Sequence, residues 1–459
     1  MHTDLKRKLD WIDAAAIFVG IILGSGIFVA PAAVAAATDS NWIAAGMWIL
    51  GAIVAASGAL CYAECGARLP KTGGFYVYYR EVWGEGVAFV GGWTALLITY
   101  PASLAAIALI LANYLQDVVP WGASPKLYAA VAVVLAGAIN ILGVRTGANT
   151  QRALTAFKVL ALLLLCVAAL TATPITPEAA VTELPLAIDN PTATLSAGPL
   201  TAAPLFPGSI AVMLSAMVIL LWTYDGWSDV TLIGGELRDP GRDFGRTVVF
   251  GISVLACLYV LVQLAINTAL TPAVAGRSQQ VVADAVAVGL GTTAGRLVAV
   301  LVVISTFGAI NGVVLTASRL GYAMAKDGAF LRVFAAIHPK FGTPARSTVA
   351  LVIATVVYVI AADFGNLMAF FSFNVWLFYS ATAVGLLILR HRKVGEPPSW
   401  RLPGGIAAPI VVIVTAVAMT SSLMIQDPKR SLVGLAMLAG GIPVYLVWRA
   451  LFKVAPPMA

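Results

Sequence analysis

The chain has 459 residues, of which 60% are hydrophobic and only 11% are charged, and its formal net charge is +7. Soluble domains carry roughly 25% charged residues, so the composition excludes a soluble globular protein and predicts an integral membrane protein. Apolar runs long enough to cross a bilayer core of about 30 Å recur along the whole sequence. The first run is too long for a cleaved signal peptide, and further runs follow it directly.

Twelve transmembrane helices are predicted from these runs, which makes the fold an all-α integral membrane protein. Their ranges are 12–37, 42–66, 85–115, 126–143, 152–173, 209–236, 246–270, 293–325, 347–362, 366–390, 406–426 and 431–452. With the amino terminus inside, 22 of the 28 lysine and arginine residues are cytoplasmic, five are outside and one is within the membrane. This positive-inside asymmetry predicts a multi-pass protein of the cell membrane with both termini in the cytoplasm.

Three connecting segments carry further signals. Residues 73–84 are rich in tyrosine and are predicted to form an interfacial helix on the cytoplasmic side. Residues 174–208 are rich in proline, threonine and alanine and are expected to form an ordered or semi-ordered outside connector. The charges after the sixth span alternate in sign and predict a solvated loop; they are Glu236, Arg238, Asp239, Arg242, Asp243 and Arg246.

Several function classes find no support in the sequence. The four cysteines all fall in predicted spans, so no disulfide framework is expected. No grouping of histidine, cysteine and carboxylate residues suggests a metal site, a cofactor or a catalytic pair. A channel would need rings of polar residues along a pore, and no such series is present. The positive charge is explained by topology rather than by nucleic acid.

The first and sixth spans are interrupted. "GIILGSGIFVAP" (Gly20–Pro31) holds three glycines, although each costs a helix roughly 1 kcal/mol relative to alanine. The sixth span is interrupted near Asp225 and Gly226. Unwound backbone offers N–H groups to a carboxylate and carbonyl groups to an ammonium. Because breaks at corresponding positions of two halves mark a transporter binding site, we expect a site for a zwitterionic amino acid here, although close helix packing also explains the Gly20–Gly24 spacing.

Three motifs carry a resemblance to a known family. "GIILGSGIFVAP" resembles the first-helix signature of the amino acid–polyamine–organocation superfamily. "YDGWSDVTLIGGELRDP" (Tyr224–Pro240) resembles the sixth-helix motif of its L-type amino acid transporter branch, especially bacterial members. "ASRLGYAMAKDGAF" (Ala317–Phe330), followed by "HPKFGTPARS" (His338–Ser347), resembles the eighth helix and the loop after it.

The resemblance implies one transporter domain with two inverted five-helix repeats and two peripheral helices. The repeats would span about 12–173 and 209–390, and the peripheral helices 406–452, with helices 1 and 6 discontinuous. It also implies alternating-access transport of amino acids. Animal members pair with a glycoprotein through a cysteine between spans three and four. Residues 116–125 contain no cysteine, so no disulfide-linked heavy chain is expected, and the partners are the amino acid substrate and the lipid bilayer.

The resemblance also implies the roles of individual residues. The substrate carboxylate would bind at Ser25 and Gly26, with Gly24 permitting the turn. The α-amino group would bind main-chain carbonyls at Ile21 or Ile22 and at the sixth-helix break. Trp222 would close over the substrate, and Ser228 would face the pocket. The substrate-binding residues are therefore expected to be Ile21, Ile22, Gly24, Ser25, Gly26, Trp222, Thr223, Asp225 and Ser228.

Lys158 lies within the fifth predicted span. In relatives of this type a lysine ammonium occupies the position of a sodium ion, so the resemblance implies sodium-independent transport, with Lys158 bridging to the unwound first helix and to Ser305 in span eight. The alternative is that Lys158 reaches the cytoplasmic interface. Glu64 lies near the cytoplasmic end of span two and is expected at the membrane interface. Tyr100 and Tyr259 stay open between packing and gating, and Asn311 and Asn374 stay open between lining the pocket and interhelical hydrogen bonding.

Asp225 has two interpretations. Its carboxylate caps the second half-helix, or it binds a cationic substrate side chain. The first accords with a sodium-independent transporter of neutral L-amino acids that works by exchange or by proton coupling. The second accords with an antiporter of basic amino acids or polyamines.

Overall fold

The computed structural model describes residues 5–119, 122–170, 209–278, 280–362, 364–398, 400, 402 and 404–452. These residues are helical and contain no strand, apart from an isolated bridge between Leu9 and Leu237. The α-helices are α1 (Trp11–Ile22), α2 (Ala30–Ala37), α3 (Asn41–Arg68), α4 (Phe75–Trp83), α5 (Glu85–Thr94), α6 (Tyr100–Val118), α7 (Pro125–Ile141), α8 (Val144–Leu170), α10 (Ser209–Thr223), α11 (Pro240–Ala269), α12 (Pro272–Ala275), α13 (Val281–Leu290), α14 (Thr292–Lys326), α15 (Ala345–Ala361), α16 (Phe364–His391), α17 (Ala407–Gln426) and α18 (Pro428–Leu451).

Four short helices of other types complete the described chain. Three are 3₁₀-helices, η1 (Gly26–Phe28), η5 (Asp229–Glu236) and η6 (Arg332–Ala335), and the fourth is the π-helix η2 (Ala95–Thr99). The π-helix joins α5 to α6, so these three elements form one continuous crossing. π-Helical turns inside longer helices are frequent at functional sites.

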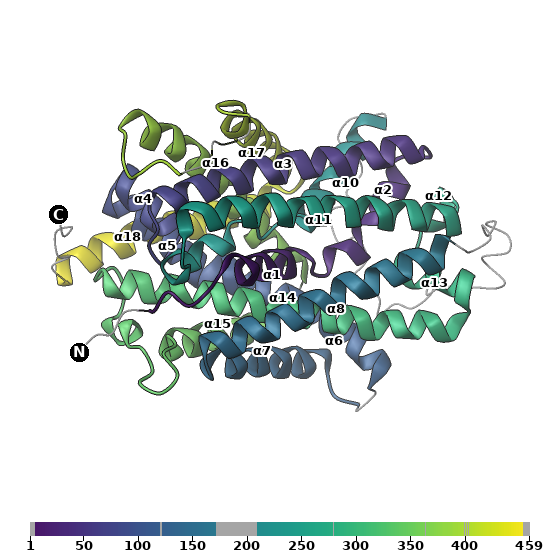
Figure 1. Ribbon diagram of the computed structural model, residues 1–459, viewed down its shortest axis with the longest axis horizontal. Helices are drawn as coiled ribbons and strands as arrows, with labels where there is room; N and C mark the ends of the chain where they lie inside the picture. The colour runs from purple at the N-terminus through teal and green to yellow at the C-terminus, as the bar shows by residue number, and fades with distance from the viewer. Residues whose placement is uncertain are drawn as a thin grey trace.

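The predicted all-helical membrane protein is confirmed. Every one of the twelve predicted ranges contains a helix or a broken helix, and eight helices of the described chain are long and apolar enough to cross a membrane. The chain enters α1 and leaves α18 at the same end of the bundle (Figure 1). The expected connector 174–208 lies outside the described residues. The arrangement of the two halves as inverted repeats stays a prediction.

The helices around α1 form the centre of the bundle. The short α1 packs against α8, α11 and α14, and α11 also packs along α3 (Figure 1). The last two helices lie outside this centre, because α17 contacts α3 and α16 while α18 contacts α5 and α16. Many of their apolar side chains are exposed, among them Val414, Val417 and Leu446. Such faces suit contact with lipid.

The predicted solvated loop after the sixth span is correct only in part, because Arg238, Asp239, Arg242 and Arg246 are exposed while Glu236 and Asp243 are buried. Glu236 is fully buried, and its carboxylate accepts hydrogen bonds from the guanidinium of Arg319 on α14 at 2.7 and 3.3 Å. Helix α11 begins at Pro240, six residues before the predicted start, because proline suits the first helical position. Glu64 is likewise buried and pairs with Arg68 and Arg390. The predicted interfacial helix is present as α4.

Candidate functional site

The first break begins with a tight turn at the end of α1. Leu23 has φ −74° and ψ 67°, and the N–H of Gly24 donates to the carbonyl of Ile22 at 2.7 Å. This is the geometry of an inverse γ-turn. Neither Gly24 nor Gly26 has a positive φ. The turn is therefore centred on Leu23 and closed by the N–H of Gly24, and the role expected of Gly24 in permitting it stays a prediction.

Gly26 is needed for a different reason. A β-carbon at this position would lie 2.8 Å from the Cα atom of Thr223, which is the last residue of α10. The two broken helices therefore cross in close contact at their breaks. In the second break Gly226 has φ 105°, a conformation that favours glycine. The chain then turns into η5, where the N–H of Asp229 donates to the carbonyl of Gly226.

Tyr259 of α11 joins the two breaks. Its buried hydroxyl lies 3.0 Å from the carbonyl oxygen of Ile22 and 3.2 Å from that of Thr223. Both carbonyls belong to the last turn of a half-helix, where no intrahelical partner exists. The sequence left Tyr259 open between packing and gating, and the structure gives it a polar contact with both breaks.

Backbone groups around the first break remain free for a ligand. The N–H groups of Ser25 and Gly26 have no acceptor among the described residues, and both residues are buried. The carbonyl of Ile22 already accepts from Gly24 and Tyr259, which occupies both of its lone pairs. The carbonyl of Ile21 accepts no hydrogen bond from any described donor. Of the two expected ammonium acceptors, Ile21 is therefore the available one.

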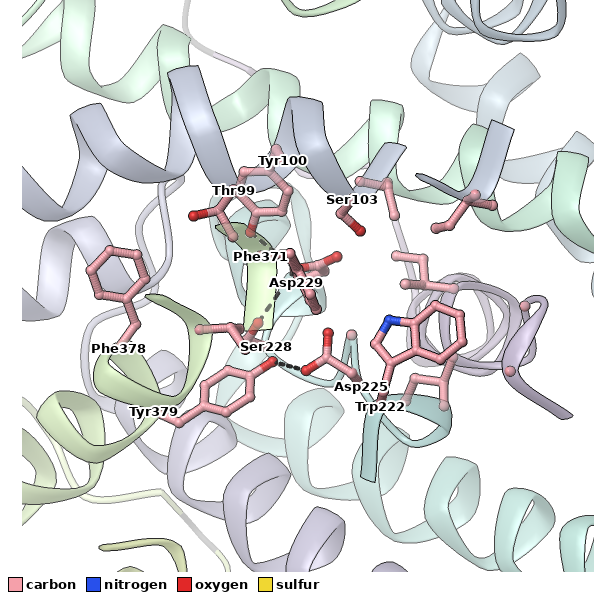
Figure 2. Close-up of a pocket in the computed structure, with 18 of the residues that line it drawn as sticks. Thr99, Tyr100, Ser103, Trp222, Asp225, Ser228, Asp229, Phe371, Phe378 and Tyr379 are labelled. Carbon is pink, nitrogen blue, oxygen red and sulfur yellow. Dashed lines mark hydrogen bonds between the residues drawn. The ribbon is translucent and has the colours of Figure 1, made fainter. Parts of the chain in front are cut away.

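A cavity lies against both breaks. Its lining includes every residue expected at the substrate site: Ile21, Ile22, Gly24, Ser25, Gly26, Trp222, Thr223, Asp225 and Ser228. Figure 2 shows the indole of Trp222 and the carboxylate of Asp225 on the side of the cavity formed by the sixth-helix break.

Several lining residues were not expected from the sequence. They come from α3, α4, η2, α6, η5 and α16 and are Tyr62, Phe75, Thr99, Ser103, Asp229, Phe371, Phe378 and Tyr379. Asp229 could have been predicted from the sequence, because it lies one turn after Asp225 in the same motif. The aromatic residues carried none, since an aromatic side chain in an apolar span serves equally well in packing.

The two cavity carboxylates each bind a tyrosine. The Tyr379 hydroxyl donates to Asp225 Oδ1 at 2.5 Å, and the Tyr100 hydroxyl donates to Asp229 Oδ1 at 2.9 Å (Figure 2). Ser228 Oγ lies 3.3 Å from the same oxygen of Asp229. No lysine, arginine or histidine is among the residues that line the cavity.

Lys158 of α8 is fully buried and points toward the first break. Its ammonium donates to the carbonyls of Gly20 at 2.8 Å and Leu23 at 2.9 Å. The Ser305 hydroxyl on α14 donates to the same Leu23 carbonyl at 3.1 Å. Lys158 and Ser305 thus meet at one carbonyl group. The alternative that Lys158 reaches the cytoplasmic interface does not describe this geometry.

Asn311 serves in packing rather than in the cavity. Its amide donates to Gln151 Oε1 at 2.8 Å and its side-chain oxygen accepts from Asn140 at 3.0 Å, which links α14 to α7 and α8. Asn374 is buried and is not among the residues that line the cavity. Tyr100, by contrast, belongs to the lining.

A bundle of membrane helices with two broken helices facing one central cavity has the architecture of a secondary transporter. A family model described as amino acid permease matches residues 9–446. The b(0,+)-type amino acid transporter 1 of Mus musculus is 32% identical over 435 residues, which cover 93% of this chain and 84% of the relative. The large neutral amino acids transporter small subunit 2 of Homo sapiens is 31% identical over 452 residues, which cover 96% and 80%.

The chain therefore belongs to the amino acid permease family, within the amino acid–polyamine–organocation superfamily. It is a multi-pass membrane protein that transports amino acids, and its relatives are transporters rather than enzymes. The resemblance to the L-type amino acid transporter branch is confirmed by the relatives.

Proposed function

We propose that this protein transports neutral L-amino acids across the cell membrane by alternating access and without sodium. The observation that carries the proposal is the pair of unoccupied N–H groups at Ser25 and Gly26, which lie beside the free carbonyl of Ile21. A half-helix N-terminus favours a carboxylate, and a free carbonyl favours an ammonium. Together they fit the two charged groups that all α-amino acids share.

The walls of the cavity support a neutral side chain. Ile107, Val313, Phe371 and Val375 contribute apolar surface, and apolar walls with few polar groups are typical of small-molecule sites. Trp222 lies at the break of the sixth span and would close over the bound amino acid. The cavity could then admit small and medium apolar side chains.

Sodium independence rests on Lys158. Its ammonium binds two carbonyls at the C-terminal end of α1, where the helix dipole favours positive charge. A fixed cation at this position would supply the positive charge that a bound sodium ion supplies in sodium-coupled transporters. If Lys158 stays charged throughout the cycle the transporter would be an exchanger, and if it titrates it would couple to protons.

A second candidate is an antiporter of basic amino acids or polyamines that uses Asp225 as the cation ligand. The observation in its favour is that two carboxylates, those of the partly buried Asp225 and the buried Asp229, face a cavity whose lining contains no cationic side chain. Against it stands the Asp225 carboxylate itself, which already accepts a hydrogen bond from the Tyr379 hydroxyl. No side chain caps the start of η5, whose N-cap residue is Ser228, so the capping role of Asp225 stays a prediction.

The remaining proposals concern topology and partners. Both termini would be cytoplasmic, and the two halves 12–173 and 209–390 would move relative to each other beside the peripheral helices 406–452. No disulfide-linked heavy chain is proposed, because the four cysteines lie in α3, α8 and α11 and residues 116–125 contain none.

The test is uptake of labelled alanine and leucine into proteoliposomes. We expect equal uptake in sodium and choline buffers, and strong stimulation by internal amino acid or by an acid-outside gradient. Lys158→Met should lower uptake at least about tenfold, because it leaves two buried carbonyls without their donor. Lys126→Met is the matched control, since Lys126 also donates to a carbonyl, that of Ile360, but is exposed.

Two outcomes would overturn the proposal. One is a strict requirement for sodium, which would contradict the role of Lys158. The other is uptake of arginine or putrescine with none of alanine or leucine, which would favour the second candidate.

A further inference from the structure

The loop that joins α14 to α15 has apolar side chains on its outer surface. Its 3₁₀-helix η6 contacts both of these helices, and Leu331 and Val333 are each 47% exposed. The loop lies at the end of the bundle where both chain termini lie (Figure 1). Apolar side chains are stabilised by leaving water. Because the loop joins two helices of the membrane bundle, lipid is the apolar medium within its reach.

Aromatic rings hold this loop against α18. The indole N–H of Trp448 donates to the carbonyl of Gly328 at 3.0 Å. The ring of Phe330 stacks on the rings of Trp448 and Phe334, with centroids 6.3 and 5.4 Å away. Tryptophan near the end of a membrane helix is typical of the headgroup region. These contacts place the loop beside α18 at the level of the membrane interface.

Two of the helices that contact the loop, α15 and α18, expose apolar faces. Val349, Ile353 and Val357 of α15 are exposed, as are Leu446 and Leu451 of α18. The three residues of α15 lie four positions apart and therefore share one face of the helix. Such faces suit contact with lipid. The exposed apolar side chains of the loop are thus bordered by two helices with lipid-facing surfaces.

The loop also carries exposed positive charges that lack acidic partners. Arg332, Lys340 and Arg346 are exposed, and so is Arg449 on α18. Residues 328–362 contain no aspartate or glutamate, and none of these four cations forms an ion pair with a residue that the structure describes. A basic segment next to a membrane helix is attracted to the negative surface potential of anionic lipids.

We propose that this loop is a binding surface for anionic phospholipids of the adjacent leaflet. Leu331 and Val333 enter the boundary between headgroups and acyl chains, and Arg332, Lys340 and Arg346 bind the lipid phosphates. Guanidinium groups suit this role because they bind phosphate through paired hydrogen bonds. An apolar anchor and a basic patch together attach a segment stably, whereas one such signal alone binds only weakly. The inference goes beyond the proposed function and does not depend on the transported substrate.

The first measurement is the depth of residue 333 in nanodiscs of phosphatidylcholine and phosphatidylglycerol. Val333→Cys carries a nitroxide label in a Cys257→Ser background, because Cys257 is exposed. Electron paramagnetic resonance compares collisions with oxygen, which concentrates in lipid, and with a nickel chelate, which stays in water. Val349→Cys is the lipid-exposed control and Glu396→Cys the water-exposed control. We expect the label at 333 to prefer oxygen, as at 349. Preference for the chelate would overturn the proposal, and so would poor access to both, which would mean that protein, such as a second copy of this chain, covers the loop.

The second measurement tests the charges by thermal unfolding of the full chain in detergent with increasing phosphatidylglycerol or phosphatidylcholine. One variant replaces the loop cations: Arg332→Gln, Lys340→Gln and Arg346→Gln. The matched control removes the same charge at the start of α11: Arg238→Gln, Arg242→Gln and Arg246→Gln.

Phosphatidylglycerol should raise the melting temperature of the wild type more than phosphatidylcholine does, and added salt should suppress the difference. The concentration for half of this rise should increase by about tenfold or more in the loop variant and stay within about threefold in the control. Equal changes in the two variants, or no specific effect of phosphatidylglycerol on the wild type, would refute the proposal. Neither measurement uses uptake, so failure of the proposed function leaves both unaffected.

Discussion

The hydroxyl of Tyr259 donates to the carbonyl of Ile22 across a distance of 3.0 Å, which ties α11 to the end of the first half-helix. The same hydroxyl is 3.2 Å from the carbonyl of Thr223. A hydroxyl has one hydrogen, so it alternates between the two acceptors or shares its hydrogen. In either case the Tyr259 hydroxyl contacts both breaks.

Tyr259→Phe should therefore impair transport more than it impairs folding. Loss of the hydroxyl leaves two buried carbonyls short of a donor and should cost about 1–3 kcal/mol. Leucine uptake and thermal unfolding in detergent are measured together. Tyr224→Phe is the control, because Tyr224 lies at the second break but its hydroxyl donates at 3.2 Å to the carbonyl of Trp48 on α3 and to neither half-helix end. Equal uptake in the two variants would contradict the role of Tyr259.

Gly26→Ala should destabilise the protein at the point where the broken helices cross. The new methyl would lie 2.7 to 2.9 Å from atoms of Thr223, including its backbone, so one of the half-helices must shift. Overpacking of this kind typically costs about 1–3 kcal/mol. Gly46→Ala is the control, since nothing lies within 4 Å of the added atom and alanine favours the helix by about 1 kcal/mol. A melting temperature of Gly26→Ala equal to that of the wild type would contradict the close crossing.

The buried pair of Glu236 and Arg319 should be costly to break. Arg319→Met leaves an unpaired buried carboxylate and should destabilise by about 3–5 kcal/mol. The partly exposed pair of Arg430 and Asp427 should contribute under about 1 kcal/mol, so Arg430→Met serves as the comparison in thermal unfolding. The double variant Glu236→Gln with Arg319→Met should recover part of the loss, and its failure to do so would show that charge is not the cause.

The contact of Asp10 with Arg152 should be insensitive to pH in the physiological range. Partial burial acts to raise the pKa of Asp10, but the N–H of Asp13 and the charge of Arg152 outweigh it and hold the pKa below its ordinary value of 3.8. A depressed carboxyl pKa stabilises the fold above the unfolded value, and that contribution disappears only as pH falls through the folded value. The effect of Asp10→Asn on the melting temperature should thus be equal at pH 7.5 and pH 5.5. If the effect of Asp10→Asn on the melting temperature is smaller at pH 5.5 than at pH 7.5, the pKa of Asp10 is higher than expected.

Most of the fold could be predicted from the sequence, because an apolar run of sufficient length has few alternatives to a membrane helix. The two breaks were also predictable, since glycine and aspartate are expensive within such helices. Tyr379 and Asn374 show what could not be predicted from the sequence. They lie five residues apart on α16, yet only Tyr379 of the two lines the cavity. Which face of a buried helix meets a cavity depends on the packing of all its neighbours, which the pattern of one helix does not contain.

The burial of Glu236 was missed for a related reason. Its partner Arg319 lies 83 positions further along the chain. A pattern of alternating charges near a helix end does not distinguish charges in contact with water from charges paired with a residue distant in sequence.

The contacts of α8 along α1 have a mechanical consequence. Arg152 binds Asp10 and Asp13 at the start of α1, Thr155 donates to the carbonyl of Ala16 at its middle, and Lys158 reaches Gly20 near its end. These three residues occur at every third position of α8 and bind it to α1 from the start of α1 to near its end. We expect α1 and α8 to move together as one rigid unit during transport. The bending would then concentrate in the few residues between Ile22 and η1, because these residues are not helical.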